Sequence, residues 1–269
     1  MPVPRRLLPI LAVAACTLAA EPAAAAVPYT PCQDEAGFEC GTVPVPLDWS
    51  GATPGTLSLH VRRARATTGV AAVSAVVPLA GGPGQAASPF ATAFQSYLTA
   101  GLGTRDLLVY DQRGTGRSAP LRCGALSRQG LSESQQVRQC AEQLGSARGY
   151  FRTAESVADI EALRIAGGYE QLVLYGVSYG TKVALAYAAA YPQRVEALIL
   201  DSALTIDGPD VLRRSTFASV SRVLRELCSG SACRGLRQSV TRILSRTARK
   251  LAKGRVKGRV TAPDGSRVT

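Results

Sequence analysis

Apolar and polar positions recur with two different periods along the middle of the chain, and these periods predict strands and helices in turn. Residues 56–64 alternate strictly, with Leu57, Leu59 and Val61 on one side, which is the period of a strand. Residues 106–110 (DLLVY) form a short apolar run, as in a strand buried within a parallel sheet. Further strands are predicted at 71–79, 171–175 and 195–200, and helices at 89–100, 153–166 and 181–191.

The order of these elements predicts an α/β fold. Strands that alternate with helices form βαβ units and a mostly parallel sheet. Residues 27–50 are irregular and rich in proline, and the region after Ser118 is polar, so we assign neither to the sheet. After Asp201 the pattern becomes helical and basic. We therefore expect a core over residues 27–207 and a second, helical region over residues 208–269.

Residues 1–26 have the pattern of an export signal. Arg5 and Arg6 precede an apolar stretch, and an A-x-A cleavage site ends at Ala26, which predicts secretion. An alternative is that VAAC acts as a bacterial lipobox, in which case Cys16 becomes the lipidated first residue of a cell-surface lipoprotein. After this segment no apolar run is long enough to span a membrane.

Cysteine usage agrees with export. Six cysteines remain after Cys16, and exported proteins hold such residues as disulfides. Six cysteines allow 15 pairings, and their spacing favours three local ones. The expected pairs are Cys32–Cys40, Cys123–Cys140 and Cys228–Cys233. A metal site is disfavoured because no C-x-x-C is present and the chain has one histidine; we expect no metal and no cofactor.

Positive charge is concentrated in the last part of the chain. The net charge is +12, and residues 213–269 hold 15 Lys or Arg against Glu226 and Asp264. A nucleic-acid-binding tail is one interpretation. However, five apolar residues recur at helical spacing through this segment, which favours an amphipathic helix with a solvated basic face and no nucleic-acid partner. They are Leu236, Val240, Ile243, Leu244 and Leu251.

The pentapeptide Gly176-Val177-Ser178-Tyr179-Gly180 lies between a predicted strand and a predicted helix. This is the G-x-S-x-G nucleophile elbow, a turn so sharp that side chains at Gly176 and Gly180 would collide with the neighbouring strand and helix. The turn exposes the hydroxyl of Ser178 at the edge of the sheet. It also places the backbone N–H of Tyr179 at a helix N-terminus, where it can stabilise an oxyanion.

An oxyanion hole needs a second N–H from a loop that follows another strand. The predicted strand at 71–79 runs into Ala80-Gly81-Gly82-Pro83-Gly84. We expect Gly82 to supply that second N–H, because a chain of glycines can approach a substrate closely.

Three motifs in this order resemble the α/β-hydrolase enzymes of the proline iminopeptidase and tripeptidyl aminopeptidase group. They are GGPGQ, YDQRGTGRS and YGVSYGTKVALAYAAAYPQRVEALILDS, at 81–85, 110–118 and 175–202. The similarity covers residues 28–205 and implies the α/β-hydrolase fold, with residues 208–269 as the start of a lid. It implies a secreted serine exopeptidase that releases short N-terminal pieces from peptides, with Ser178 as nucleophile. The chain has Ala80 where the family usually carries histidine.

In this fold the triad runs in the order Ser, acid, His, yet no histidine follows Ser178. The one histidine, His60, lies on the predicted strand at 56–64 opposite its apolar side, so we expect it to face solvent. Asp201 ends the strand after the elbow and is expected to make turn or cap hydrogen bonds. The sequence therefore predicts an N-terminal portion of a hydrolase that is poorly active alone.

Two other functions fit the same residues. The elbow does not distinguish amide from ester substrates, so an esterase of the same fold is one alternative. The other is a non-catalytic domain that binds a ligand in a hydrolase-like cleft.

Overall fold

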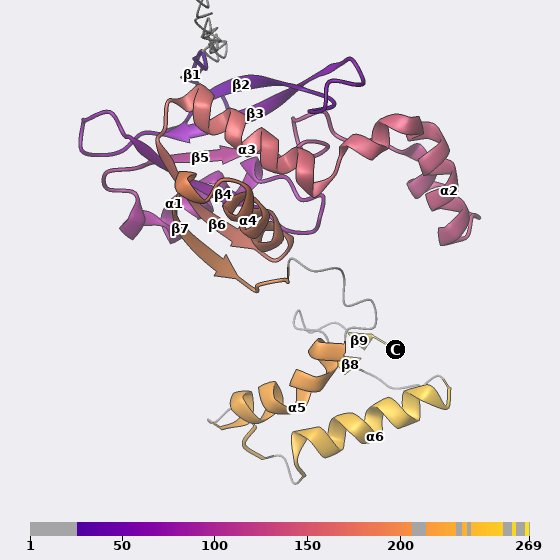
Figure 1. The fold of residues 1–269 in the computed structure, drawn as a ribbon. Helices are drawn as coiled ribbons and strands as arrows, with labels where there is room; N and C mark the ends of the chain where they lie inside the picture. The colour runs from indigo at the N-terminus through magenta and orange to yellow at the C-terminus, as the bar shows by residue number, and fades with distance from the viewer. Residues whose placement is uncertain are drawn as a thin grey trace, which may run out of the picture. The chain divides into compact units, whose positions relative to one another are not determined.

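The structure is a computed structural model that describes residues 26–205, 214–229, 233–235, 238–254, 260–261 and 267–268. The predicted export signal and Cys16 lie outside the described residues. The chain divides into two compact units, Met1–Ile206 and Asp207–Thr269 (Figure 1). In the described residues, no helix is both long and apolar enough to cross a lipid bilayer.

The first unit contains a seven-stranded sheet with the strand order β1-β2-β3-β5-β4-β6-β7. Strands β1, β2 and β3 are antiparallel and join β5 in antiparallel register, whereas β5, β4, β6 and β7 are parallel. The mostly parallel sheet expected from the sequence is thus confirmed. The strands are β1 Thr30–Pro31, β2 Glu39–Pro46, β3 Thr56–Ala64, β4 Ser74–Leu79, β5 Asp106–Tyr110, β6 Gln171–Val177 and β7 Val195–Asp201.

Helices cover both faces of this sheet (Figure 1). The helices α3 and α4 pack on one face, against a core that includes Leu59, Leu79 and Leu174. The helix α1 packs on the other face, where Phe94 meets Val76 and Val109. Both faces are apolar because alternate residues of the buried strands point to opposite sides. The helices are α1 Ala91–Tyr97, α2 Glu133–Leu144, α3 Thr153–Gly167 and α4 Tyr179–Ala190, with short 3₁₀ segments at Ser88–Phe90, Thr99–Gly101, Gly124–Ser127, Gly145–Tyr150 and Pro192–Arg194.

The expectation that residues 27–50 are irregular is wrong. Strand β2 pairs with β3 along its whole length, and Val43 and Val45 are buried in the core. Its prolines are tolerated because β1 pairs only with residues 39 and 40, so the rest of β2 is an edge where a proline can occupy a position whose backbone points away from the ladder.

The polar region after Ser118 contains a helix that its composition does not predict. Helix α2 begins with a capping box in which Ser132 and Gln135 each bond the other's backbone. The spacing S-x-x-Q is a recognised helix start, and it is the signal that finds this element. None of the α2 residues is buried, so the apolar period that marks α3 and α4 is missing there.

The second unit contains α5 Arg214–Cys228, α6 Val240–Ala252 and the short strands β8 Val260–Thr261 and β9 Arg267–Val268. Helix α6 includes four of the five apolar residues that predict an amphipathic helix, and the fifth, Leu236, lies outside the described residues.

Disulfides join the cysteines in the three local pairs that the spacing favours. The bonds are Cys32–Cys40, Cys123–Cys140 and Cys228–Cys233.

A buried ion pair holds three parts of the first unit together. The guanidinium of Arg113, in the loop after β5, donates to Asp159 of α3 at 2.7 and 2.5 Å. The side chains are 1% and 0% exposed. Arg113 also donates to the Leu47 and Tyr150 carbonyl oxygens at 2.8 and 2.9 Å, and the Trp49 indole donates to Asp159 at 3.0 Å. With a fifth hydrogen bond to the Pro46 carbonyl oxygen at 3.2 Å, every N–H of the Arg113 guanidinium has a partner.

Burial raises the pKa of the Asp159 carboxyl, and the hydrogen bonds from Arg113 lower it only in part. Desolvation thus offsets much of the attraction within the pair, as is common for buried ion pairs. The pair still matters for stability, because removing one partner leaves the other charge buried and uncompensated, which strongly lowers the stability of the folded protein.

We expect Asp159→Asn to lower the free energy of unfolding by about 3–5 kcal/mol, because Arg113 is left buried without a counter-charge. Urea unfolding followed by fluorescence of Trp49, the one tryptophan of the chain, measures the change in this unit. The control is Arg65→Gln, which removes an ion-pair partner that is 67% exposed and should cost less than about 0.5 kcal/mol. Equal shifts for the two variants would contradict the role given to the pair. The double variant R113M/D159L should regain much of the loss.

Candidate active site

Ser178 lies at the turn between β6 and α4. Its backbone has φ 52° and ψ −117°, which is an unfavourable conformation for a residue with a Cβ. The Ser178 N–H donates to the Asp201 carbonyl oxygen at the end of β7, at 2.9 Å. Neighbouring structure therefore holds the serine in a strained turn at the C-terminal edge of the parallel strands.

The two glycines of the G-x-S-x-G motif lie against backbone on both sides of the turn. A Cβ on Gly180 would come within 2.0 Å of the Leu79 carbonyl oxygen, at the end of β4. A Cβ on Gly176 would come within 2.7 Å of the Gly180 carbonyl oxygen and of Thr181 backbone atoms. Backbone atoms cannot move aside as a flexible side chain can, so both positions require glycine.

The loop that follows β4 passes directly beside Ser178. A Cβ on Gly81 would lie 3.1 Å from the Ser178 Cβ and 3.7 Å from its Oγ. Gly82 comes next, with φ +108°, a conformation that favours glycine. Tyr179 is the first residue of α4, where a backbone N–H has no acceptor within the helix. Two backbone segments that carry N–H groups thus converge on one hydroxyl.

Asp111, fully buried after β5, fixes the far end of that loop. Its carboxylate accepts from the Ser88 N–H and hydroxyl at 2.8 and 2.9 Å, and from the Arg117 N–H at 2.9 Å. The next residue, Gln112, donates from its side chain to the Ala80 carbonyl oxygen at 3.2 Å. The segment 81–88 is therefore anchored at both ends by the loop after β5.

Sequence reasoning used residues 110–118 only for their resemblance to a family and missed this anchoring role. The signal that finds it is the pair of glycines in the motif. A Cβ on Gly116 would come within 2.1 Å of an Asp111 carboxylate oxygen, and both Gly114 and Gly116 have positive φ. The tight turn wraps the backbone around the carboxylate.

Thr181 ties the elbow to the segment after β7. Its hydroxyl donates to the Ser178 carbonyl oxygen at 2.6 Å and accepts from the Leu204 N–H at 2.8 Å. On the other side of the turn, the hydroxyls of Tyr179 and Thr153 are 2.9 Å apart. These side-chain contacts help to hold Ser178 in its strained conformation.

Asp201 makes the local hydrogen bonds that its position predicts. Its carboxylate accepts from the Ser202 hydroxyl at 2.9 Å and from the Tyr175 hydroxyl at 3.3 Å, and its backbone carbonyl accepts from Ser178. The residue is exposed.

The expectation that His60 faces solvent is wrong. His60 is 8% exposed, because the loop after β5 and the segment at residues 34 and 35 cover this face of β3. The backbone N–H of His60 donates to the Ser118 hydroxyl at 2.8 Å, and Arg62 pairs with Asp34 at 2.8 Å. Burial lowers the pKa of the imidazole, although Asp111 nearby raises it in part.

His60 is also remote from Ser178. Strands β5 and β4 lie between β3 and β6 in the sheet. Three steps at about 4.8 Å each separate the two strands by roughly 14 Å, which exceeds the reach of a hydrogen bond. The structure therefore does not bring the one histidine of the chain to the serine.

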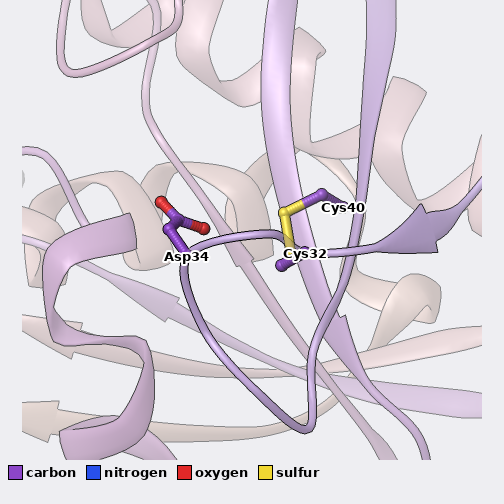
Figure 2. A group of neighbouring side chains, drawn as sticks. All are labelled: Cys32, Asp34 and Cys40. Atoms are coloured by element: carbon purple, nitrogen blue, oxygen red, sulfur yellow. A yellow bond between two sulfur atoms is a disulfide. The ribbon is translucent and has the colours of Figure 1, made fainter.

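Cys32, Asp34 and Cys40 are the one group within the described residues whose side chains lie close enough to hold a metal ion (Figure 2). Both sulfur atoms are used in the Cys32–Cys40 disulfide, whereas a cysteine ligand must be a thiolate. The Asp34 carboxylate accepts from Arg62 at 2.8 Å and from Arg117 at 2.7 Å. The three side chains form a disulfide beside an ion-pair network, and this chemistry does not fit a metal site.

Known proteins with similar sequences include a family and several named relatives. The family described as "alpha/beta hydrolase fold" matches residues 75–262. The chain is 30% identical to the serine protease Hip1 of Mycobacterium tuberculosis over 207 residues, which cover 66% of this chain and 39% of that protein. It is 26% identical to a tripeptidyl aminopeptidase of Streptomyces coelicolor over 188 residues, 61% of this chain and 35% of that protein.

Solved structures with a similar fold include the proline iminopeptidase of Mycobacterium smegmatis. The identity is 19% and the TM-score 0.37, over 58% of this chain and 42% of that one. The chain thus spans about two fifths of the length of the relatives that it matches.

The strain at Ser178 predicts that two substitutions of this residue differ in stability. Ser178→Gly relieves the positive φ and should raise the free energy of unfolding by about 1 kcal/mol relative to Ser178→Ala, which keeps the Cβ. Both variants lack the hydroxyl, so their difference isolates the backbone. Thermal and urea unfolding of the pair measure it. A Ser178→Gly variant no more stable than Ser178→Ala would show that the turn is not strained.

The close approach at Gly180 predicts a large loss of stability. Gly180→Ala should lower the free energy of unfolding by more than about 3 kcal/mol, since the new methyl group overlaps the end of β4. Gly103→Ala is the matched control, because nothing lies within 4 Å of its Cβ position, and it should change stability by less than about 1 kcal/mol. Urea midpoints of the two variants compare the effects. Similar midpoints would rule out the proposed backbone contact.

Proposed function

Since the chain belongs to the alpha/beta hydrolase fold family, we propose that it contributes the nucleophile, Ser178, to a serine hydrolase that acts on peptides. The observation that carries the proposal is the convergence at Ser178: a strained serine, the N-terminus of α4 and the Gly81 backbone lie together at one edge of the sheet. The relatives named serine protease and tripeptidyl aminopeptidase support peptides as the substrate class.

The proposed chemistry is acyl transfer. The Ser178 Oγ attacks the carbonyl carbon of the scissile bond, and the N–H groups of Gly82 and Tyr179 stabilise the oxyanion that forms. The positive end of the α4 dipole favours the same charge. The C–N bond then breaks, the amine leaves with a proton from the general acid, and water releases the acyl group from Ser178.

A serine attacks effectively only when a base removes its proton. No histidine follows Ser178 in the sequence, and His60 is buried three strands away. In this proposal the histidine and the acid of the triad come from outside these 269 residues. The chain alone is then inactive or nearly so, because the loss of triad members typically costs several orders of magnitude in rate.

The finer part of the proposal is an exported exopeptidase that releases short pieces from peptide N-termini. The export-signal pattern and three disulfides support an oxidising compartment. Relatives named tripeptidyl aminopeptidase and proline iminopeptidase support cleavage near an N-terminus.

We expect added imidazole to act as the missing base. Labelling of the 269-residue chain by a fluorophosphonate probe should be slow in buffer and should rise with imidazole concentration, because imidazole can accept the Ser178 proton. Ser178→Ala should abolish the labelling, and Ser202→Ala, which changes a neighbouring serine, should keep it. Gel fluorescence and mass spectrometry of the labelled peptide measure both.

The outcomes separate the candidate functions. Rapid labelling and peptide hydrolysis without imidazole, both lost in Ser178→Ala, would show that these 269 residues already contain the general base. That result would overturn the proposal that the base comes from outside them. No labelling of Ser178 at any imidazole concentration would favour a non-catalytic ligand-binding domain. Turnover of p-nitrophenyl esters but not of peptide p-nitroanilides would favour an esterase.

A further inference from the structure

Helix α6 of the second unit exposes a continuous apolar stripe. Its apolar side chains recur at the i, i+3, i+4 spacing that places residues on one face of a helix. Ile243 is 36% exposed, Leu244 45% and Leu251 57%. On helix α5, Phe217 is 71% and Leu227 62% exposed. Exposed large apolar side chains are thus present on both helices, and on α6 their spacing brings them to one face, as is typical of an interaction surface.

At about 3.6 residues per turn, the basic side chains of α6 lie on the face opposite this stripe, apart from Lys250, which lies next to Ile243. Helix α6 contains no Asp or Glu, and no basic residue of 240–254 forms an ion pair among the residues that the structure describes. Arg246 instead donates to the Gln238 side chain, and Arg249 donates to the Ser245 carbonyl oxygen at 3.2 Å. The basic residues of this segment are Arg242, Arg246, Arg249, Lys250 and Lys253. Within the described part of the chain, no acidic side chain neutralises their charge.

This combination favours an anionic membrane surface over a nucleic acid. The phosphate backbone of a nucleic acid attracts arginines but makes no favourable contact with exposed leucines. Proteins that bind single-stranded nucleic acids also stack the bases on aromatic side chains. No aromatic residue follows Phe217 in the sequence. A helix with an apolar face and an opposite basic face matches the interface of an anionic bilayer, where both faces find a favourable environment.

We propose that α6 binds the surface of an anionic lipid bilayer and lies parallel to it. The stripe of Ile243, Leu244 and Leu251 enters the boundary between headgroups and acyl chains. The basic side chains of the opposite face stay in the headgroup and water layer, where the negative charge of the lipid phosphates attracts them. The proposal does not depend on catalysis by Ser178, since it concerns a different unit of the chain.

The test is flotation of the full 269-residue protein with lipid vesicles. We expect binding to vesicles of equal parts phosphatidylcholine and phosphatidylglycerol, and little binding to phosphatidylcholine alone. The variant R242E/R246E/R249E should bind the anionic vesicles at least about tenfold more weakly. The variant R242K/R246K/R249K should bind like the wild type. Added salt should weaken binding of the wild type.

A control variant separates the helix from overall charge. R122E/R128E/R138E changes the net charge by the same amount at exposed residues of the first unit and should bind like the wild type. Leu244→Trp reports insertion directly: its fluorescence should shift to shorter wavelength when anionic vesicles are added, whereas that of Trp49 in the wild type should not.

Several results would overturn the proposal. They are equal binding to neutral vesicles, unchanged binding by R242E/R246E/R249E, and no spectral shift in Leu244→Trp. Salt-sensitive binding to DNA without vesicle binding would identify the segment as a nucleic-acid tail. Binding to neither would mean that the apolar stripe is used within the protein.

Discussion

The close approach of three backbone segments at Ser178 is the constraint on which the first unit depends. Strand β4, strand β6 and helix α4 meet so tightly that a single methyl group at Gly180 would lie 2.0 Å from the Leu79 carbonyl oxygen. Such an approach is open only to glycine. The same turn has Ser178 at a positive φ and places its side chain beside the loop after β4. The backbone strain at Ser178 and the close approach of β4 to α4 therefore have the same cause, the tight packing of these segments.

Buried polar groups hold the surrounding loops against that turn. The Asp111 carboxylate accepts from Ser88, which begins the 3₁₀ turn before α1. It also accepts from the Arg117 N–H of its own loop. Arg113, two residues later, binds Asp159 of α3. Because each of these groups is buried, an unmade hydrogen bond would cost far more than at the surface. Buried hydrogen bonds thus fix the loops that lie beside Ser178, although these loops have irregular backbones.

The two units follow different physical rules. The first buries its apolar residues on both faces of a sheet. It pairs the buried Arg113 with Asp159 and gives the buried Asp111 hydrogen-bond donors from Ser88 and Arg117. The second exposes apolar side chains such as Leu251, and its helix α6 concentrates basic ones that have no acidic partner among the described residues. Covering such exposed apolar side chains would stabilise the second unit, whereas the first unit buries its apolar side chains in its own core.

The sequence by itself determined most elements of the sheet and predicted the elbow at Ser178. Periodicity located β3 and β5 to the residue, and the spacing of Gly176, Ser178 and Gly180 predicted the elbow, because both signals are local in the chain. It failed for β2, where prolines conceal a strand that pairing with β3 supports. It failed for His60 because alternation says which residues share a face but not what covers that face. Only the tertiary structure decided that a loop buries His60, and that Gly81 meets Ser178 across 97 residues of sequence.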